Sequence, residues 1–120
     1  MIGQQGFQMI IREWRGRATS SKAELYPTHF RANVLPGLLK TPGFLGAFLS
    51  KRQLDTEIEF LVLTRWQSID AIRSFAGSDI ARAVVEPGAI AALVDFDTSV
   101  QHYEVIEETQ SRLASPHHSL

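Results

Sequence analysis

Residues 44–66 contain two apolar, strand-forming runs of similar length with only a short polar turn between them. The runs FLGAFLSKRQL and EIEFLVLTRW are rich in β-branched and large apolar side chains, and Asp55 and Thr56 separate them. Short connections of this kind join antiparallel neighbours, so the pattern predicts a hairpin of residues 44–54 and 57–66. A long apolar hairpin is not stable alone in water, and it therefore requires further strands and a covering layer.

The segment QMIIREWRGRA, residues 8–18, has the alternation of a strand that is covered on one face. Its period of two places Ile10, Arg12 and Trp14 on one side and Met9 and Ile11 on the other. We expect the side that carries Trp14 to face the covering layer.

The first helix is predicted to begin at Ser21, because the Ser21 hydroxyl and the Glu24 carboxylate have the spacing of a capping box. Pro36 disfavours helical geometry at the residue before it, so we expect a kink or a restarted turn at that point. The helix should end before the TPG sequence at residues 41–43. Its inner apolar stripe consists of Ala23, Tyr26, Phe30, Val34 and Leu38.

A second helix is predicted directly after the hairpin. Ser68 is placed to cap it, and Gly77 occupies the position of a C-terminal cap. Residues 78–85 are predicted to add one or two helical turns, residues 89–96 to be helical or irregular, and residues 99–107 to form a final strand. The order β-α-β-β-α-β predicts an α+β, ferredoxin-like antiparallel sheet with central first and third strands and helices on one face.

Composition and length narrow the class of protein. The 120 residues are 44% hydrophobic and 21% charged, with no cysteine and a net charge of -1. This length suits one domain that needs no disulfide or metal for stability. The low net charge argues against nucleic acid as a partner, and no apolar run approaches the ~20 residues of a membrane helix. We expect a cytoplasmic protein with an extension at 1–8, a domain at 9–107 and a flexible tail at 108–120.

The face of the predicted sheet that points away from the helices should be apolar. Four large side chains are assigned to it by the alternation of the first and third strands: Met9, Ile11, Leu61 and Leu63. A bare apolar face in water is an association surface, so we expect a homodimer that buries it.

Three stretches carry a family pattern, namely PGFLGAFL at 42–49, EFLVLTRWQSIDAIRSFAGSD at 59–79 and HYEV at 102–105. In them the chain resembles the antibiotic-biosynthesis-monooxygenase-type members of the dimeric α+β barrel superfamily, over about residues 9–106. The resemblance implies a homodimeric barrel in which two sheets pack face to face and each subunit keeps a cavity between sheet and helices. Members of the superfamily include cofactor-independent oxygenases of quinol-like aromatics, haem-degrading enzymes, isomerases, cyclases and proteins without known activity.

The haem-degrading members use an asparagine on the first strand, a tryptophan on the second helix and a histidine one helical segment later. Aligned along this chain, those positions fall near Trp14, at Phe75 and at Val85. None of these side chains supplies the corresponding group, and valine cannot ligate iron. The resemblance therefore implies no haem here, and we expect no cofactor.

His29 and Tyr26 are the candidate acid and base residues. With a reference pKa of about 6.5, His29 can take a proton from an acidic phenol or enol, and Tyr26 can hydrogen-bond a ligand oxygen from the same helix. One fixed cation in a mostly apolar pocket predicts a flat, partly anionic or phenolic ligand and no required metal. The candidate ligand-binding residues, which should converge between helices and sheet, are Arg12, Trp14, Phe30, Phe75 and Val85.

Other aromatic and imidazole side chains are assigned structural roles. Trp66 ends the third strand beside a capped helix, where a large ring seals the sheet against the helix ends. His102 and Tyr103 point to opposite faces of the last strand, so only one of them can enter the cavity. His117 and His118 are adjacent in the tail without carboxylate partners, which makes a poor metal site.

Two functions of different classes remain open from the sequence. The first is a small enzyme, a cofactor-independent monooxygenase or a related proton-transfer enzyme acting on an aromatic, quinol-like or polyketide-like molecule. The second is a non-catalytic homodimeric module that binds a hydrophobic small molecule or serves in interactions. An open pocket with His29 or Arg12 facing inward favours the enzyme, whereas a closed gap filled by apolar side chains favours the module.

Overall fold

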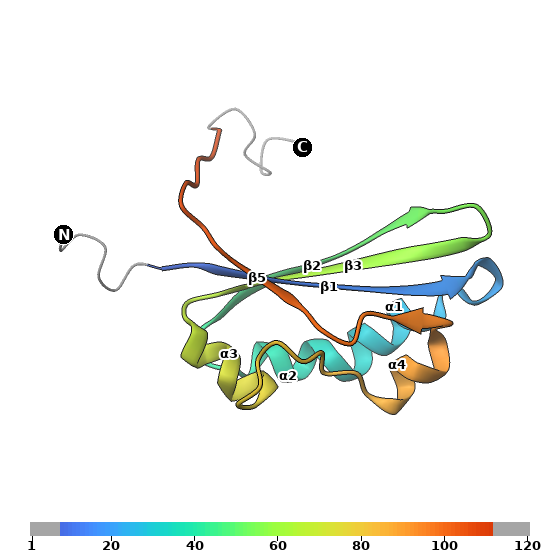
Figure 1. Ribbon diagram of the computed structural model, residues 1–120, viewed down its shortest axis with the longest axis horizontal. Coiled ribbons are helices and arrows are strands. Elements are labelled where there is room, and N and C mark those ends of the chain that lie inside the picture. The colour runs from blue at the N-terminus through green and yellow to red at the C-terminus, as the bar shows by residue number, and fades with distance from the viewer. Residues whose placement is uncertain (1–7, 112–120) are drawn as a thin grey trace, which may run out of the picture.

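The computed structural model describes residues 8–111, which form one five-stranded sheet with four short α-helices on one of its faces (Figure 1). The strands are β1 (Ile10–Thr19), β2 (Phe44–Gln53), β3 (Glu57–Trp66), β4 (Asp95–Phe96) and β5 (Gln101–Glu104). The α-helices are α1 (Leu25–His29), α2 (Leu35–Leu39), α3 (Ile69–Ala76) and α4 (Pro87–Ala92). Most of the predicted N-terminal extension and C-terminal tail, including His117 and His118, lies outside the described residues.

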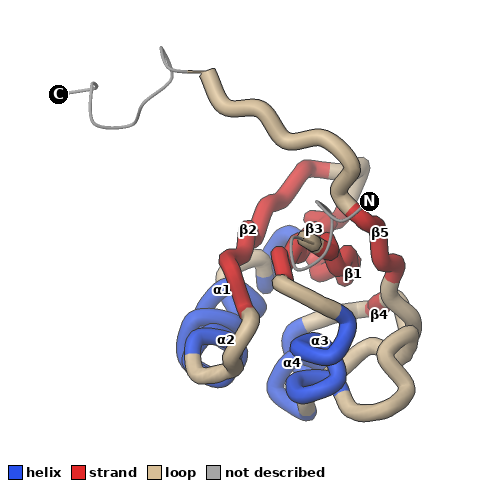
Figure 2. The backbone as a smooth tube through the Cα atoms, turned by 90° about the vertical axis from the view of Figure 1, so that its left-hand side faces the viewer, coloured by secondary structure: helices blue, strands red, loops and turns tan. Residues whose placement is uncertain are grey.

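The order of the strands confirms the predicted α+β, ferredoxin-like topology. β1 and β3 are the central strands, β2 lies beside β3, and both β4 and β5 pair with β1. All of these pairings are antiparallel, and the β1–β3 ladder runs from Ile10 opposite Trp66 to Thr19 opposite Glu57. Figure 2 shows the four helices together below the sheet, so one face is covered and the other points away from the helices.

The hairpin and the helix after it agree with the predictions. β3 has the predicted bounds, and the backbone N–H of Leu54 donates to the carbonyl of Glu57 across the turn at 2.8 Å. The Ser68 hydroxyl accepts a hydrogen bond from the backbone N–H of Ala71 at 3.1 Å, which caps α3. Gly77 ends that helix with a φ of 90°, a value that glycine adopts without strain.

The first helical segment begins differently from the prediction. Ser21 lies in a 3-10 turn, η2 (Ser20–Lys22), and Glu24 is the N-cap residue of α1 without a side-chain capping bond. The predicted capping box therefore does not form. The Ser21 hydroxyl lies 3.3 Å from the Thr19 hydroxyl, so it is used in the turn before the helix rather than at its end.

The irregularity expected near Pro36 takes the form of a π-helical turn, η3 (Phe30–Val34), between α1 and α2. In it the backbone N–H of Leu35 donates to the carbonyl of Phe30, five residues earlier. Proline has no N–H and its ring crowds the preceding turn, so a wider turn before it relieves the conflict. α2 then starts again with Pro36 in its first turn.

The final strand, predicted over residues 99–107, is shorter than predicted, because β5 spans only Gln101–Glu104. The stretch 89–96, predicted to be helical or irregular, begins within α4 and ends in the short strand β4. β4 pairs with β1 at Gly16 and Arg17, whereas β5 pairs with it from Ile10 to Glu13. Between these pairings the chain leaves β1 after Asp97, whose N–H still donates to the carbonyl of Arg15 at 2.9 Å. We refer to residues 97–100 as the edge bulge.

The helical prediction for residues 78–85 is wrong. Part of this segment runs beside the edge bulge, with an antiparallel bridge between Arg82 and Ser99. The N–H of Ala83 donates to the carbonyl of Thr98 at 2.9 Å, and the N–H of Val100 donates to that of Ala81 at 2.8 Å. Backbone groups that would bond within a helix are thus satisfied by a distant segment. No helix among the described residues has the length and apolar character needed to cross a bilayer.

Trp66 has the packing role predicted for it. It is completely buried, and its indole N–H donates to the Thr64 hydroxyl at 2.8 Å. Its ring lies 5.3 Å from that of Phe44 and 5.7 Å from that of Phe75, so it joins β2, β3 and α3. The other fully buried large side chains are Phe60, Leu38 and Ile72.

The sheet face away from the helices is less uniformly apolar than predicted. The strand register places the four predicted side chains on it, and each is half-buried: Met9, Ile11, Leu61 and Leu63. The exposed rings of Phe48 and Tyr103 join this face, because Phe48 pairs with Leu63 and Tyr103 with Ile11.

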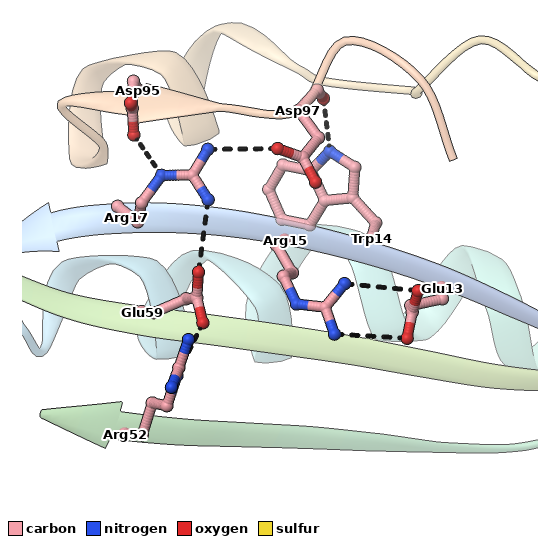
Figure 3. Close-up of polar contacts among 8 residues, drawn as sticks. All are labelled: Glu13, Trp14, Arg15, Arg17, Arg52, Glu59, Asp95 and Asp97. Carbon is pink, nitrogen blue, oxygen red and sulfur yellow. Dashed lines mark hydrogen bonds and ion pairs between the residues drawn. The ribbon is translucent and has the colours of Figure 1, made fainter. Parts of the chain in front are cut away.

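Charged side chains occupy one half of the same face (Figure 3). Arg17 contacts Asp95, Asp97 and Glu59, and Glu59 also pairs with Arg52 at 2.8 Å. The hydrogen bond from Arg52, with a further one from Arg17, holds the pKa of Glu59 below its ordinary value. This cluster, together with a Glu13–Arg15 pair nearer the centre, makes the face a mixed surface of apolar and paired charged groups.

Candidate functional site

A pocket lies between the helices and the covered face of the sheet. It has a volume of about 130 Å³, is partly open, and is lined mainly by apolar side chains. The structure places all seven predicted site residues in its wall: Arg12, Trp14, Tyr26, His29, Phe30, Phe75 and Val85. The pocket therefore brings together side chains from β1, the first helical segment, α3 and the segment before α4.

Trp14 forms a rigid side of the pocket. Its indole N–H donates to the carbonyl of Asp97 at 2.7 Å, which fills the gap left by the edge bulge (Figure 3). Its ring lies 5.7 Å from that of Tyr26 and 6.4 Å from that of Phe96. A Cβ atom on Gly16 would come within 2.8 Å of the Trp14 ring, so only glycine at this position lets the indole pack against the strand without a clash. Trp14 thus combines a structural role with a place in the pocket.

Arg12 lies on the covered face of β1 and is only 6% exposed. Its guanidinium donates to the carbonyl of Ile80 at 2.6 Å and to that of Arg82 at 3.2 Å. The same group contacts Nε2 of His102 at 2.9 Å, and His102 must accept because arginine can only donate. Burial lowers the pKa of Arg12 to about 10, so the side chain is still a cation at neutral pH.

His102 and Tyr103 lie on opposite faces of β5, as predicted. His102 pairs with Arg12 on the covered side, and burial together with the Arg12 charge lowers the pKa of its imidazole. Tyr103 lies on the other side of the sheet, where its hydroxyl donates to the Glu13 carboxylate at 3.4 Å. Neither side chain is in the wall of the pocket.

His29 lies in the wall of the pocket with a side chain that is 9% exposed. Its Nδ1 lies 3.1 Å from the amide nitrogen of Asn33, and its Nε2 lies 3.6 Å from a carboxylate oxygen of Glu86. Nε2 is buried and has no hydrogen-bond partner within residues 8–111. A Cβ on Gly88 would come within 2.6 Å of the ring, so this glycine allows α4 to approach the imidazole closely.

Tyr26 is buried beside His29, with 6.1 Å between the two ring centres. Burial raises the pKa of its hydroxyl, and the negative charge of Glu86 raises it further. Tyr26 therefore stays protonated at neutral pH, as a hydrogen-bond donor and not as a base. Tyr26, His29 and Glu86 form what we call the polar end of the pocket.

Glu86 is the residue at this site that sequence reasoning missed. It precedes Pro87 and Gly88, and it contacts a histidine that lies far from it in the chain. The EPG sequence at residues 86–88 predicts only a turn. The Glu86 carboxylate and Gly88 contact His29 because α4 packs against α1. Asn33 and Thr64 also line the pocket without having been predicted.

The geometry defines an α+β domain of ferredoxin-like topology with a pocket between the sheet and its helical layer. The model of the family described as "Antibiotic biosynthesis monooxygenase" matches residues 9–87, more than half of the chain. The chain therefore belongs to the antibiotic biosynthesis monooxygenase family, as the resemblance seen in the sequence implied. No curated protein matches it.

Several solved structures have the same fold as this chain. A protein described as an antibiotic biosynthesis monooxygenase from Bacillus cereus is 16% identical, with a TM-score of 0.63 over 87% of this chain and 99% of that one. The heme-degrading protein Rv3592 from Mycobacterium tuberculosis is 19% identical, with a TM-score of 0.55 over 88% and 99%. The cofactor-independent oxygenase SnoaB from Streptomyces nogalater is 17% identical, with a TM-score of 0.50 over 87% and 96%. At these identities the likeness is one of fold.

The pocket does not fit a haem. Its volume of about 130 Å³ lies below the roughly 300–1,000 Å³ of sites for larger ligands. Nε2 of His102 is engaged by Arg12 outside the pocket wall, and Nε2 of His29, which has no hydrogen-bond partner among the described residues, lies 3.6 Å from the Glu86 carboxylate. Within the described residues no cluster of three histidine, aspartate or glutamate side chains is arranged to hold a metal ion.

Proposed function

We propose that this protein binds a small, flat aromatic or enolic molecule between sheet and helices, and that His29 takes a proton from it. The observation that carries this proposal is the buried Nε2 of His29, which has no hydrogen-bond partner among residues 8–111 and lies in the pocket wall. A buried polar atom without a partner is costly, and one at a pocket calls for a ligand group.

The proposed step is a proton transfer from a phenolic or enolic O–H of the ligand. The O–H bond breaks, the proton moves to Nε2 of His29, and the electron pair stays on the ligand oxygen. The Glu86 carboxylate, 3.6 Å from Nε2, stabilises the imidazolium that forms. The Glu86 side chain is 46% exposed, so it is free to move aside when the ligand hydroxyl approaches Nε2. Tyr26, as a neutral donor, stabilises the ligand anion.

In an oxygenase, the deprotonated ligand then reacts with molecular oxygen as the oxidant. For a ring CH₂ group, one oxygen atom becomes a new carbonyl oxygen and the other leaves as water with the two hydrogens. For a quinol, one oxygen atom becomes the hydroxyl oxygen of a hydroxyquinone and the other leaves as water. Such a reaction fits the family to which the chain belongs and the activity for which SnoaB is named. Support from SnoaB is limited to the shared fold.

A second candidate function is a non-catalytic module that binds the same kind of molecule. The observation in its favour is that Asn33 donates to Nδ1 of His29, which leaves the proton of the neutral ring on Nε2. A ring in that tautomer is a donor at Nε2 and not a base. Catalysis then requires the Asn33 amide to turn over, so that its oxygen accepts from Nδ1 and Nε2 becomes free.

Oxygen uptake and product formation with a series of monocyclic quinols and bicyclic anthrone-like phenols test the enzymatic proposal. Removing a general base typically lowers the rate by about 10²- to 10⁴-fold, so we expect a loss of this size in His29→Ala. Thr28→Ala, an exposed neighbour on α1, is the matched control and should keep the wild-type rate. If His29→Ala turns over as fast as wild type, His29 is not the base. If the quinols bind but wild type never turns over, the non-catalytic module is the better description.

We infer further that two copies associate through the sheet face that points away from the helices. Half-buried Met9, Ile11, Leu61 and Leu63, with exposed Phe48, support this arrangement. An obligate interface of this kind should bury about 2,000 Å² or more. Light scattering should give the mass of a dimer, and Leu63→Glu should shift it toward the monomer. A stable wild-type monomer at low concentration contradicts the inference.

A further inference from the structure

Arg12 is a buried cation to which the structure gives no acidic partner. Within residues 8–111 no carboxylate pairs with its guanidinium, whereas Arg15, Arg17 and Arg52 on the other face of the sheet all have carboxylate partners. Glu13 is next to Arg12 in sequence but lies on the opposite face of β1 and pairs with Arg15. These three more solvated arginines are paired with carboxylates, whereas the buried Arg12 is not.

We propose that Arg12 receives the anionic group of the ligand, so that the ligand is a hydroxyaromatic or enolic acid bound by its carboxylate at Arg12 and by its hydroxyl at the polar end. This inference rests on the proposed function, because it assumes that the same pocket takes the ligand. It adds the chemical class of the ligand and its orientation in the pocket.

The hydrogen bonds of Arg12 leave room for such a partner. A guanidinium has five N–H donors, and three contacts use the terminal nitrogens: those to Ile80, Arg82 and His102. Carbonyl and imidazole acceptors carry no full negative charge, so they compensate a buried cation only in part. A carboxylate that enters the pocket supplies the missing charge and forms the stronger, charge-assisted type of hydrogen bond.

The charges of the pocket fix the direction of the ligand. Arg12 and Trp14 lie two residues apart on the same face of β1, the Trp14 ring is 5.7 Å from that of Tyr26, and the Tyr26 ring is 6.1 Å from that of His29. The Trp14 ring therefore lies on the strand that carries the cation and beside Tyr26 of the polar end. The Glu86 carboxylate at the polar end repels a second carboxylate, whereas Arg12 attracts it.

The volume of the pocket limits the ligand to about one ring. A cavity of about 150 Å³ in another protein accepts benzene, and the pocket here measures about 130 Å³. A single aromatic ring with a carboxylate and a hydroxyl on opposite sides satisfies the size, the apolar walls and the two different ends. The probe with this composition is 4-hydroxybenzoate.

Calorimetric titration of the full chain with three ring compounds tests the proposal. The probes are 4-hydroxybenzoate, its neutral amide 4-hydroxybenzamide, and the neutral quinol hydroquinone. We expect 4-hydroxybenzoate to bind at least about tenfold more tightly than the amide, which corresponds to one charge-assisted hydrogen bond. In Arg12→Gln the two should bind equally, whereas Arg31→Gln, which removes an exposed charge outside the pocket, should keep the preference.

The outcomes separate this inference from the proposed function. Equal binding of acid and amide to wild type, or a preference that survives in Arg12→Gln, overturns the role of Arg12. Binding of hydroquinone without a preference for the acid overturns it too but leaves the proposed pocket standing. If none of the probes binds, the inference fails and the proposed function loses its support as well. Should Arg12→Gln fail to fold, Arg12→Lys keeps the charge without the planar fork, and the preference should persist in weakened form.

Discussion

Two helical glycines, Gly88 beside His29 and Gly37 in the pocket wall, give a matched test of how His29 is held. A Cβ on Gly88 of α4 would come within 2.6 Å of Nδ1 and 2.8 Å of Cε1 of His29, whereas a Cβ on Gly37 of α2 meets nothing within 4 Å. Both glycines have ordinary backbone angles, so alanine is tolerated by the backbone at either position. The two substitutions therefore differ mainly in their effect on His29.

Gly37→Ala should stabilise the protein by about 0.4–1 kcal/mol, because alanine loses less backbone entropy on folding. In Gly88→Ala the same entropic gain in stability should be offset by a loss of ~1–3 kcal/mol, because the added methyl group overpacks against the imidazole. The difference between the two variants, roughly 1–3 kcal/mol, isolates the contact with His29. It can be measured by urea unfolding, with the histidine resonances followed by NMR in both variants.

The expected NMR result is a displaced His29 resonance in Gly88→Ala and an unchanged one in Gly37→Ala. If the ring is pushed out of the pocket wall, turnover should fall in Gly88→Ala. Gly37→Ala, which adds a methyl group to the pocket wall itself, is compared only by its stability and by the His29 resonance. Equal stabilisation by both substitutions, with His29 unmoved, would mean that α4 does not approach the imidazole as described. The place of Glu86 beside Nε2 would then be wrong as well, since Glu86 and Gly88 belong to the same end of α4.

Three further predictions concern the core, the pH dependence of stability and haem. Trp66→Ala should lower the free energy of unfolding by about 3–5 kcal/mol in urea titrations, because it empties a fully buried site. The folded-state pKa of His102 lies below its unfolded value of about 6.5, so the unfolded chain binds more protons between these values. Stability should therefore fall as the pH is lowered from 7 through that window, and His102→Gln, which keeps an acceptor for Arg12, should lose this part of the pH dependence. Haemin with a reductant should give neither a specific Soret shift nor a ring-opened product, and a stoichiometric complex with histidine ligation would contradict the poor fit of the pocket.

The parts of the fold that were predictable are those whose signals are local. The period of two in β3 and the Ser68 cap of α3 each act within a few residues, and both elements have the expected bounds. The alternation of β1 also brought Arg12 and Trp14 to the covered face, where the pocket lies. The prediction succeeded there because the alternation of a strand alone decides which side chains face the helices.

The errors arose where distant segments decide the structure. Residues 78–85 have helical composition but bond to the edge bulge, which lies between β4 and β5 far along the chain. The contact between His29 and Glu86 depends on how α4 meets α1, and no spacing in the sequence encodes it. The partners of Arg12 were not predictable for the same reason, because Ile80, Arg82 and His102 reach it from distant parts of the chain.

The break between β4 and β5 also bears on how a ligand reaches the pocket. Segment 79–86 is joined to the sheet through a few bonds to the edge bulge and through the two carbonyls held by Arg12, whereas β1 and β3 are paired along their whole length. Proteins open locally where such bonds are few, at free energies well below that of global unfolding. We therefore expect this segment to open locally at a lower free energy than the whole domain, and its opening should widen the entrance of the partly open pocket, whose wall includes Val84, Val85 and Glu86.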